Sequence, residues 1–252
     1  AKYIGECLES VVNQSLQDIE IICIDAGSTD GTREILAEFA KRDSRIKIVD
    51  SDKKSFGYQE NQGIALARGE YIGFVETDDY IEKNMFELLY DAAKKNNLDS
   101  AKCNYYSFIN VDEKHRVFWR TQILGSKQFE GMYNVVINGS DYPEIMWRDN
   151  STCNGIYKTQ FLRDKNILLN ETPGAAYQDW GLEVQIMCKA GRMMYIEDGL
   201  YNYRKDNENS SIRNPKGLVN LFNEFLFVKD FLINNSDNMC WHWWMCFARF
   251  TG

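Results

Sequence analysis

An apolar stretch that runs directly into clustered carboxylates is the part of this sequence best suited to chemistry. Residues 71–75 are apolar or small, and Glu76, Asp78 and Asp79 follow them closely. Because side chains alternate along an extended chain, Glu76 and Asp78 are expected to face the same side. Like charges this close repel, and protonation or a bound cation relieves the repulsion. Carboxylate oxygens hold Mg²⁺ or Mn²⁺ and, through the cation, phosphate oxygens. A solvated acidic turn is the alternative interpretation.

A second acidic strand end lies earlier in the chain. Residues 19–25 are rich in β-branched side chains and end at Asp25, and Gly27 and Ser28 follow in a polar turn. Apolar side chains then recur at helical spacing within residues 31–42. In open α/β sheets, ligands bind beyond the carboxyl ends of the strands, where helix N-termini favour anions. Asp25 therefore stands where a nucleotide would bind, although ordinary connections between strands and helices also use Gly, Ser and Asp.

A further carboxylate, Asp179, stands at a predicted junction between a loop and a helix. The loop contains Pro173 and Gly174, and apolar side chains follow Trp180 at intervals. Asp is a common cap because its carboxylate accepts hydrogen bonds from the first amides of a helix. The local pattern therefore favours a capping role for Asp179, with catalysis as the alternative.

Helical and strand-like patterns alternate through the N-terminal part of the chain, which predicts an α/β fold with a parallel sheet and helices on both faces. A helix that opens such a unit implies a preceding strand, which we expect before residue 1. We also expect a helix from Gly217, and an aromatic cluster at 240–247 that packs on the core or on a membrane surface. The predicted helices cover 3–13, 31–42, 59–68 and 82–96, and the predicted strands cover 19–25, 46–50, 71–76 and 101–109.

Composition narrows the class of protein further. The chain has 252 residues, 44% of them hydrophobic, and a net charge of −8. The negative charge argues against a nucleic acid partner. Seven cysteines are dispersed without a CxxC pair, which favours reduced thiols over a disulfide framework. No apolar run has the length of a membrane-spanning helix.

Taken together, the motifs resemble the family 2 glycosyltransferases, bacterial enzymes of the GT-A fold that build capsule, lipopolysaccharide or related surface glycans. The resemblance covers nearly the whole chain. Each segment is short, but their order and spacing are specific in combination. The matching segments are 3–14, 25–32, 61–63, 67–72, 76–79, 154–158, 178–179, 203–204 and 210–211.

The resemblance implies a GT-A architecture: a Rossmann-like, mostly parallel central sheet flanked by helices, with a smaller acceptor-side region and C-terminal helices. It divides the chain into three parts. Residues 1–109 form the half that binds the nucleotide-sugar, residues 110–215 form the acceptor-binding and catalytic half, and residues 216–252 form a C-terminal helical segment.

On the donor side, the resemblance implies roles for individual residues. Asp25 looks like the carboxylate that accepts from the nucleotide base, and the segment 76–79 looks like the DxD motif with Glu in place of its first Asp. Asp78 and Asp79 would bind Mn²⁺ or Mg²⁺, with either able to be the direct ligand. The nucleotide-binding set is Asp25, Gly27, Ser28, Asn61, Glu76, Asp78 and Arg204, with Arg204 on the diphosphate.

On the acceptor side, Asp179 is similar to the general base of inverting members, and Asn154 and Trp180 would line the acceptor. The collective match reverses the preference for a plain cap at Asp179. The QxxRW motif of processive polymerases does not occur, which favours transfer of a single sugar.

The activity implied is metal-dependent transfer, of the hexosyltransferase type, from a nucleotide-diphosphate sugar, typically a UDP-sugar, to a glycan or lipid-linked acceptor. The resemblance places it in bacterial surface-polysaccharide synthesis, in the cytoplasm, with peripheral contact to the inner face of the membrane as one option. Two alternatives stay open: a non-catalytic GT-A-like domain that binds a nucleotide or partner, and a phospho-acceptor signalling domain, for which the chain is too long.

Overall fold

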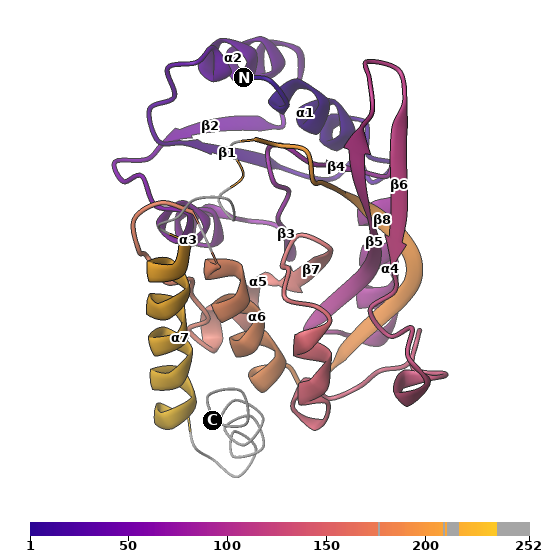
Figure 1. Ribbon diagram of the computed structural model, residues 1–252. Coiled ribbons are helices and arrows are strands. Elements are labelled where there is room, and N and C mark those ends of the chain that lie inside the picture. The colour runs from indigo at the N-terminus through magenta and orange to yellow at the C-terminus, as the bar shows by residue number, and fades with distance from the viewer. Residues whose placement is uncertain (176, 209, 211–216, 236–252) are drawn as a thin grey trace.

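The computed structural model describes residues 1–175, 177–208, 210 and 217–235 (Figure 1). The aromatic cluster predicted at 240–247 lies outside the described residues, as does Ser211. Of the predicted segment 216–252, the structure describes the helix α7 (Gly217–Asn234) and the residue after it.

The N-terminal part alternates helix and strand as predicted. The hydrophobic pattern explains why: Ile4, Cys7, Leu8 and Val11 are the buried residues of the first helix and stand at helical spacing along it. The helices are α1 (Ile4–Val12), α2 (Thr32–Arg42), α3 (Phe56–Leu66) and α4 (Met85–Asn96), and the strands are β1 (Ile21–Asp25), β2 (Ile46–Asp50), β3 (Tyr71–Gly73), β4 (Tyr80–Ile81) and β5 (Ser100–Asn110).

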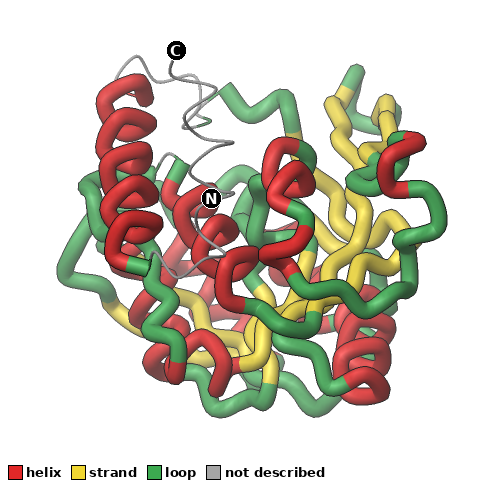
Figure 2. Tube along the Cα trace, turned by 90° about the horizontal axis from the view of Figure 1, so that it is seen from below, coloured by secondary structure: helices red, strands yellow, loops and turns green. Residues whose placement is uncertain are grey.

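The remaining part is less regular. Short 3₁₀ turns at Lys127–Phe129, Gly139–Asp141 and Pro143–Trp147 connect β6 (Arg116–Thr121) to β7 (Gly155–Lys158), and α5 (Thr159–Asp164), α6 (Gln178–Lys189) and β8 (Met193–Arg204) follow. The helix α6 is almost wholly buried, with Leu182, Val184 and Ile186 at 0% exposure. It packs against α7 beside it (Figure 1). Seen from below, helices lie on either side of the strands (Figure 2).

The strand pairing corrects the prediction of a mostly parallel sheet. The strands β1 and β2 pair in parallel as a two-stranded sheet, and a second sheet has the order β3-β7-β5-β8-β4, with β6 also on β5. In that second sheet β5 and β8 are parallel, and the other described pairs are antiparallel. Strand–helix–strand crossovers favour parallel pairs, but β7 and β8 come from outside that alternation, and β6 returns from β5 by a hairpin. The α/β class is confirmed, with a mixed sheet.

Two described strand edges face the same cleft. The strand β1 pairs with β2 alone among the described strands, and β3 pairs with β7 alone. Residues of both strands line one cleft. A further strand before residue 1 stays a prediction. None of the described helices is both long enough and apolar enough to cross a membrane.

Candidate active site

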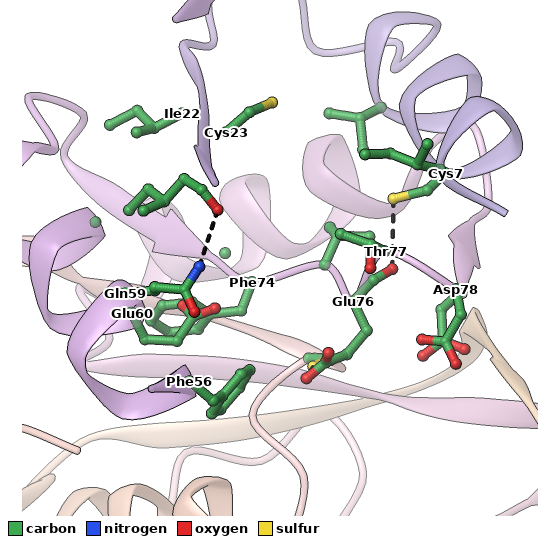
Figure 3. A pocket seen from close by; sticks show the side chains of 18 of the residues that line it. Cys7, Ile22, Cys23, Phe56, Gln59, Glu60, Phe74, Glu76, Thr77 and Asp78 are labelled. Atoms are coloured by element: carbon green, nitrogen blue, oxygen red, sulfur yellow. Dashed lines mark hydrogen bonds between the residues drawn. The ribbon is translucent and has the colours of Figure 1, made fainter. Parts of the chain in front are cut away.

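The predicted carboxylates converge on one cleft of about 1740 Å³. Its lining runs along β1 and β3, continues into the segments that follow them, and includes residues of the first turn of α6. Figure 3 shows part of the lining, with Ile22, Glu60 and Glu76 among the labelled side chains. Its lining includes Asp25, Glu76, Asp78, Asp79 and Asp179. Of the other predicted site residues, Gly27, Ser28, Asn154 and Trp180 also line it. Segments that are far apart in the sequence therefore form one acidic site.

The loop after β1 presents Asp25 as an ionised acceptor. Its carboxylate accepts hydrogen bonds from the backbone N–H groups of Gly27 and Ser28, each 3.1 Å from Oδ2, and from Arg33 Nη1 at 2.8 Å. Gly27 has φ of 76°, a left-handed conformation that favours glycine. Burial alone would raise the pKa of Asp25, but the hydrogen bonds from Ser28, Arg33 and Gly27 lower it below its ordinary value. Asp25 therefore stays negatively charged at neutral pH.

The acidic segment 76–79 folds into a turn held by Tyr201 on β8. The Tyr201 hydroxyl accepts from the Glu76 backbone N–H at 3.2 Å and donates to Asp79 Oδ2 at 2.6 Å. The backbone N–H of Arg204 donates to the other Asp79 oxygen at 2.7 Å. Burial and the neighbouring Asp78 raise the pKa of Asp79 to about 7. Because β3 already ends at Gly73, this turn, rather than strand alternation, sets where the acidic side chains point.

Asp78 is the better-placed metal ligand of the two candidates. Its side chain is half-buried and lines the cleft, and Asn207 Nδ2 donates to one carboxylate oxygen, Oδ2, at 2.8 Å. In Asp79, by contrast, both oxygens already accept hydrogen bonds. Within the described residues, no group of three or more His, Cys, Asp or Glu side chains could hold a metal by itself.

Arg204 does not lie where a diphosphate contact was predicted. Its side chain is only 2% exposed and is not part of the cleft lining. Its Nε donates to the Asp78 carbonyl oxygen and its Nη2 to Glu6 Oε2, each at 2.7 Å. Lys205, the next residue, lines the cleft, and its Nζ lies over the Tyr203 ring at 3.9 Å from the ring centre. Side chains alternate at the end of β8, which places Lys205 rather than Arg204 in the cleft lining. A diphosphate contact of Arg204 stays a prediction.

Asn61 also lies away from the cleft. Its side chain donates to the Leu169 carbonyl oxygen and accepts from the Leu169 N–H, each at 2.9 Å, and it does not line the cleft. Gln59 and Glu60, on another side of α3, do line it, and Gln59 Nε2 donates to the Ile24 carbonyl at 3.1 Å (Figure 3). The rotation of α3 about its axis depends on packing with distant residues, which the local sequence does not encode. Nucleotide binding by Asn61 stays a prediction.

Two acidic side chains of the cleft are held in weakly solvated surroundings. Burial, and then the nearby Glu60 carboxylate, raise the pKa of Glu76 well above its ordinary value. Burial raises the pKa of Glu60 to about 7. Cys153 Sγ lies 3.7 Å from Glu76 Oε1, and Cys7 Sγ donates to the Glu76 carbonyl at 3.4 Å (Figure 3). Glu60 was missed in the sequence because it stands in an ordinary amphipathic pattern.

Asp179 lines the cleft but is not the N-cap of its helix, a position that Tyr177 occupies. It occupies the first turn of α6, and Tyr177 before it adopts φ of 67°. Burial raises the pKa of Asp179 to about 6, while hydrogen bonds from the backbone N–H groups of Trp180 and of Asp179 itself oppose this rise. A carboxylate with that pKa is mostly ionised at neutral pH and can accept a proton.

Asn154 lines the cleft just before the start of β7 but is largely committed to the fold. Its Nδ2 donates to the Cys103 carbonyl oxygen at 2.8 Å, and its side chain is 1% exposed. Its Oδ1 is buried without a hydrogen-bond partner among the described residues. An acceptor contact of Asn154 therefore stays a prediction.

Comparisons with known proteins identify the family. The sequence model of glycosyl transferase family 2 matches residues 1–164. Glycosyltransferase GlyG of Streptococcus pneumoniae serotype 4 is 31% identical over 221 residues, which cover 81% of this chain and 67% of that protein. The uncharacterized glycosyltransferase EpsJ of Bacillus subtilis is 32% identical over 221 residues, covering 84% of this chain and 60% of that protein. The chain thus spans about two thirds of the length of these relatives.

Solved structures support the same fold. The crystal structure of S. aureus TarS 1–349 in complex with UDP-GlcNAc has a TM-score of 0.76 at 20% identity, covering 94% of this chain and 65% of that chain. The mannosyltransferase PcManGT from Pyrobaculum calidifontis, in complex with GDP-Man and Mn²⁺, has a TM-score of 0.56 at 12% identity, covering 84% of this chain and 55% of that chain. At these identities the likeness concerns the fold alone. Together with the family match and the converging acidic cleft, it leads to one conclusion: the chain belongs to glycosyl transferase family 2.

Proposed function

We propose that this protein is an inverting glycosyltransferase that moves one sugar from a UDP-sugar to a hydroxyl group of a glycan or lipid-linked acceptor. The observation that carries the proposal is the convergence of Asp25, the 76–79 turn and Asp179 on one cleft. A non-catalytic domain would have no need of an ionisable carboxylate on the same cleft as the acidic turn. The proposal assigns residues 1–109 to the donor side and 110–215 to the acceptor side.

The donor nucleotide is proposed to bind between the loop after β1 and the 76–79 turn. Asp25 is ionised and can accept a hydrogen bond from the base. The loop glycine Gly27 leaves open space beside it, because a Cβ at this position would have no atom within 4 Å. Lys205 lines the same cleft and can contribute positive charge to the diphosphate. Bound UDP and UDP-GlcNAc in TarS structures support the choice of UDP.

A divalent cation, Mn²⁺ or Mg²⁺, is proposed to bind with the donor through Asp78. Such a cation supplies Lewis-acid stabilisation of the negative charge on a leaving diphosphate. Asp79 is proposed to hold the turn in place through Tyr201 rather than to act as a direct ligand, because its oxygens already accept hydrogen bonds at 2.6 and 2.7 Å. The Mn²⁺ bound in the mannosyltransferase PcManGT supports the class of cation.

Asp179 is proposed to be the general base. It takes the proton of the acceptor hydroxyl as that oxygen attacks the anomeric carbon, the bond from this carbon to the diphosphate oxygen breaks, and UDP leaves with the electron pair. Attack from the face opposite the leaving group inverts the anomeric configuration. Trp180, beside Asp179 in the cleft lining, supplies an aromatic surface suited to a sugar ring.

The biological setting is proposed to be synthesis of a bacterial cell-surface polysaccharide. One relative carries the name poly(ribitol-phosphate) beta-glucosyltransferase and is 39% identical over 100 residues, or 38% of this chain. Acceptors in such syntheses are often lipid-linked, so the proposal includes cytoplasmic action with peripheral contact at the inner face of the membrane.

The pH dependence of turnover should report the Asp179 carboxylate. Its pKa is raised to about 6, and a general base works only when deprotonated, so kcat/KM is expected to fall by about tenfold per unit well below pH 6. A pH series from about 4.5 to 8 measures this fall of kcat/KM at low pH, which is the acid limb of the pH profile. Asp91→Asn removes an exposed carboxylate of α4 outside the cleft, and the limb should persist in that variant. A profile that stays flat to the acid end of the series would contradict the assignment.

The proposed activity is tested by incubating the full-length protein with UDP-sugars and Mn²⁺ and measuring release of UDP. Hydrolysis to water is expected at a slow rate without acceptor, because the cleft can position water where a hydroxyl would bind. At least one UDP-sugar should be consumed, and EDTA should suppress the release. Release that is equal in the Asp78→Asn and wild-type proteins would argue against the proposed donor site.

A further inference from the structure

A fully buried cluster of charges lies outside the cleft lining, beneath its acceptor side. Lys102 of β5 has 0% side-chain exposure, and its Nζ lies 2.7 Å from Asp149 Oδ2 and 2.8 Å from Glu183 Oε1. The same ammonium donates to the Ser151 carbonyl oxygen at 2.8 Å. Asp149 and Glu183 side chains are likewise 0% exposed. One cation thus connects a strand, a loop and a helix.

Gly155 on β7 provides the space through which the Lys102 side chain passes. A Cβ at Gly155 would lie 2.9 Å from Lys102 Cγ and 2.9 Å from the Ala101 carbonyl oxygen. Any other residue at this position would displace the lysine or the strand. The path of the lysine therefore depends on a glycine in the neighbouring strand.

Such a cluster requires an explanation other than stability. Taking charges out of water costs more free energy than packing apolar side chains of similar size, and buried ion pairs often add little net stability. What they can add is a defined geometry, because each carboxylate must remain next to its cation. Burial would lower the pKa of Lys102, but the charges of Asp149 and Glu183 outweigh it and raise the pKa, so the lysine remains charged.

The partners of Lys102 lead directly to the catalytic side of the cleft. Glu183 stands four residues after Asp179 in α6, one turn further along the same helix. Ser151 lines the cleft itself, and it precedes Cys153, whose Sγ lies 3.7 Å from Glu76 Oε1. The cluster thus holds both the helix that carries Asp179 and a loop whose residues line the same cleft.

Lys102 also acts on Asp179 through its charge. The lysine lowers the pKa of Asp179 and so favours its ionised form, against the effect of burial. Burial raises the pKa of each of the other described groups that interact electrostatically with Asp179, so each carries less negative charge at neutral pH than it would in water. These groups are the side chains of Glu76, Cys153, Glu183, Tyr203 and Glu224. Among the described residues whose charges act on Asp179, Lys102 is the one that is positively charged.

We infer that Lys102 is a positioning residue for sugar transfer: it holds the first turns of α6 and the loop 149–154 in register through its contacts with Glu183, Asp149 and Ser151. The inference rests on the proposed role of Asp179 as base. It assigns a function to a residue that touches neither donor nor acceptor.

The test compares Lys102→Met with Ile186→Ala in the full-length protein. Ile186 is buried in the same helix, and its truncation leaves a cavity without changing any charge. In Lys102→Met, kcat is expected to fall at least about tenfold, KM for the UDP-sugar to stay within about threefold, and the acid limb of kcat/KM to move up by roughly 0.5–1 pH unit. In Ile186→Ala, the melting temperature should fall and the limb should stay in place.

Gly155→Ala is the second variant, for the case in which Lys102→Met does not fold. Its Cβ would crowd Lys102 Cγ and the Ala101 carbonyl oxygen, and the variant keeps every charge, so kcat should fall with KM for the donor nearly unchanged. The inference is overturned if Lys102→Met or Gly155→Ala folds and keeps the wild-type kcat and limb, or if Ile186→Ala moves the limb equally. Asp179→Asn separates the two ideas. If Asp179→Asn retains turnover, Asp179 is not the base. If Asp179→Asn is inactive and Lys102→Met behaves like the wild type, only the inference about Lys102 is refuted.

Discussion

Replacement of Asp179 by asparagine is expected to lower kcat by about 10²–10⁴-fold, because the acceptor hydroxyl would lose the group that takes its proton. Asparagine has nearly the same shape, and its side-chain oxygen can still accept from the first amides of α6. The hydrogen bonds from the backbone N–H groups of Trp180 and of residue 179 itself should therefore survive, and the melting temperature should change little. The expected phenotype is a folded protein that cannot turn over its donor.

Two measurements together check this expectation. Single-turnover assays with a UDP-sugar measure the chemical step, and calorimetry with UDP measures donor binding. Donor binding should stay within about twofold of wild type because the proposed role of Asp179 is on the acceptor side. Asp91→Asn, on the exposed side of α4, controls for the loss of one carboxylate. Wild-type turnover in Asp179→Asn would refute the base assignment, and loss of UDP binding would move Asp179 to the donor site.

The second large effect concerns Arg204, which the structure places beneath the acidic turn. Arg204→Met removes the hydrogen bond from Nε to the Asp78 carbonyl and the ion pair with Glu6, each at 2.7 Å. Its guanidinium also packs against the rings of Tyr3 and Phe108 at 4.3 and 4.6 Å. Loss of these buried contacts is expected to reduce the free energy of unfolding by about 2–4 kcal/mol. For a chain of this length, that lowers the melting temperature by roughly 5–15 °C.

Lys205→Met is the matched variant, because Lys205 is the neighbouring cation and lines the cleft. Its stability should stay close to wild type, while its affinity for UDP should fall by about tenfold through loss of a charged phosphate contact. Thermal denaturation and UDP calorimetry on both variants separate the two roles. If Arg204→Met kept the wild-type melting temperature but lost UDP binding, the diphosphate contact predicted for Arg204 from the sequence would be correct.

Local patterns in the sequence predicted the individual helices and strands better than they predicted which strands pair. The helix α1 and the strand β1 follow from residue spacing within each segment, and both form close to the predicted bounds. The antiparallel pairing of β3 with β7 depends instead on the register that places Tyr71 opposite Lys158, which no local pattern encodes. The predicted parallel sheet therefore failed where strands from the less regular part enter.

The site shows the same division at the level of single side chains. Acidic strand ends predicted Asp25 and the 76–79 turn because clustered carboxylates are informative wherever they stand. Choosing Lys205 over Arg204, or Glu60 over Asn61, required knowing which face of a strand or helix meets the cleft, and packing sets that face. Lys102 gave no signal, because a lysine in a strand looks like an ordinary edge residue until its buried carboxylate partners are known.

The central claim is that the cleft binds a nucleotide diphosphate with a divalent cation through Asp78. The most direct measurement is calorimetry of UDP binding to the full-length protein, with and without Mn²⁺, in the wild type and in Asp78→Asn. The account predicts that Mn²⁺ strengthens UDP binding at least about tenfold, equivalent to about 1.4 kcal/mol, and that Asp78→Asn abolishes this gain. Equal UDP binding in the two proteins with Mn²⁺, or no binding of UDP, GDP, TDP or CMP under any of these conditions, would contradict it.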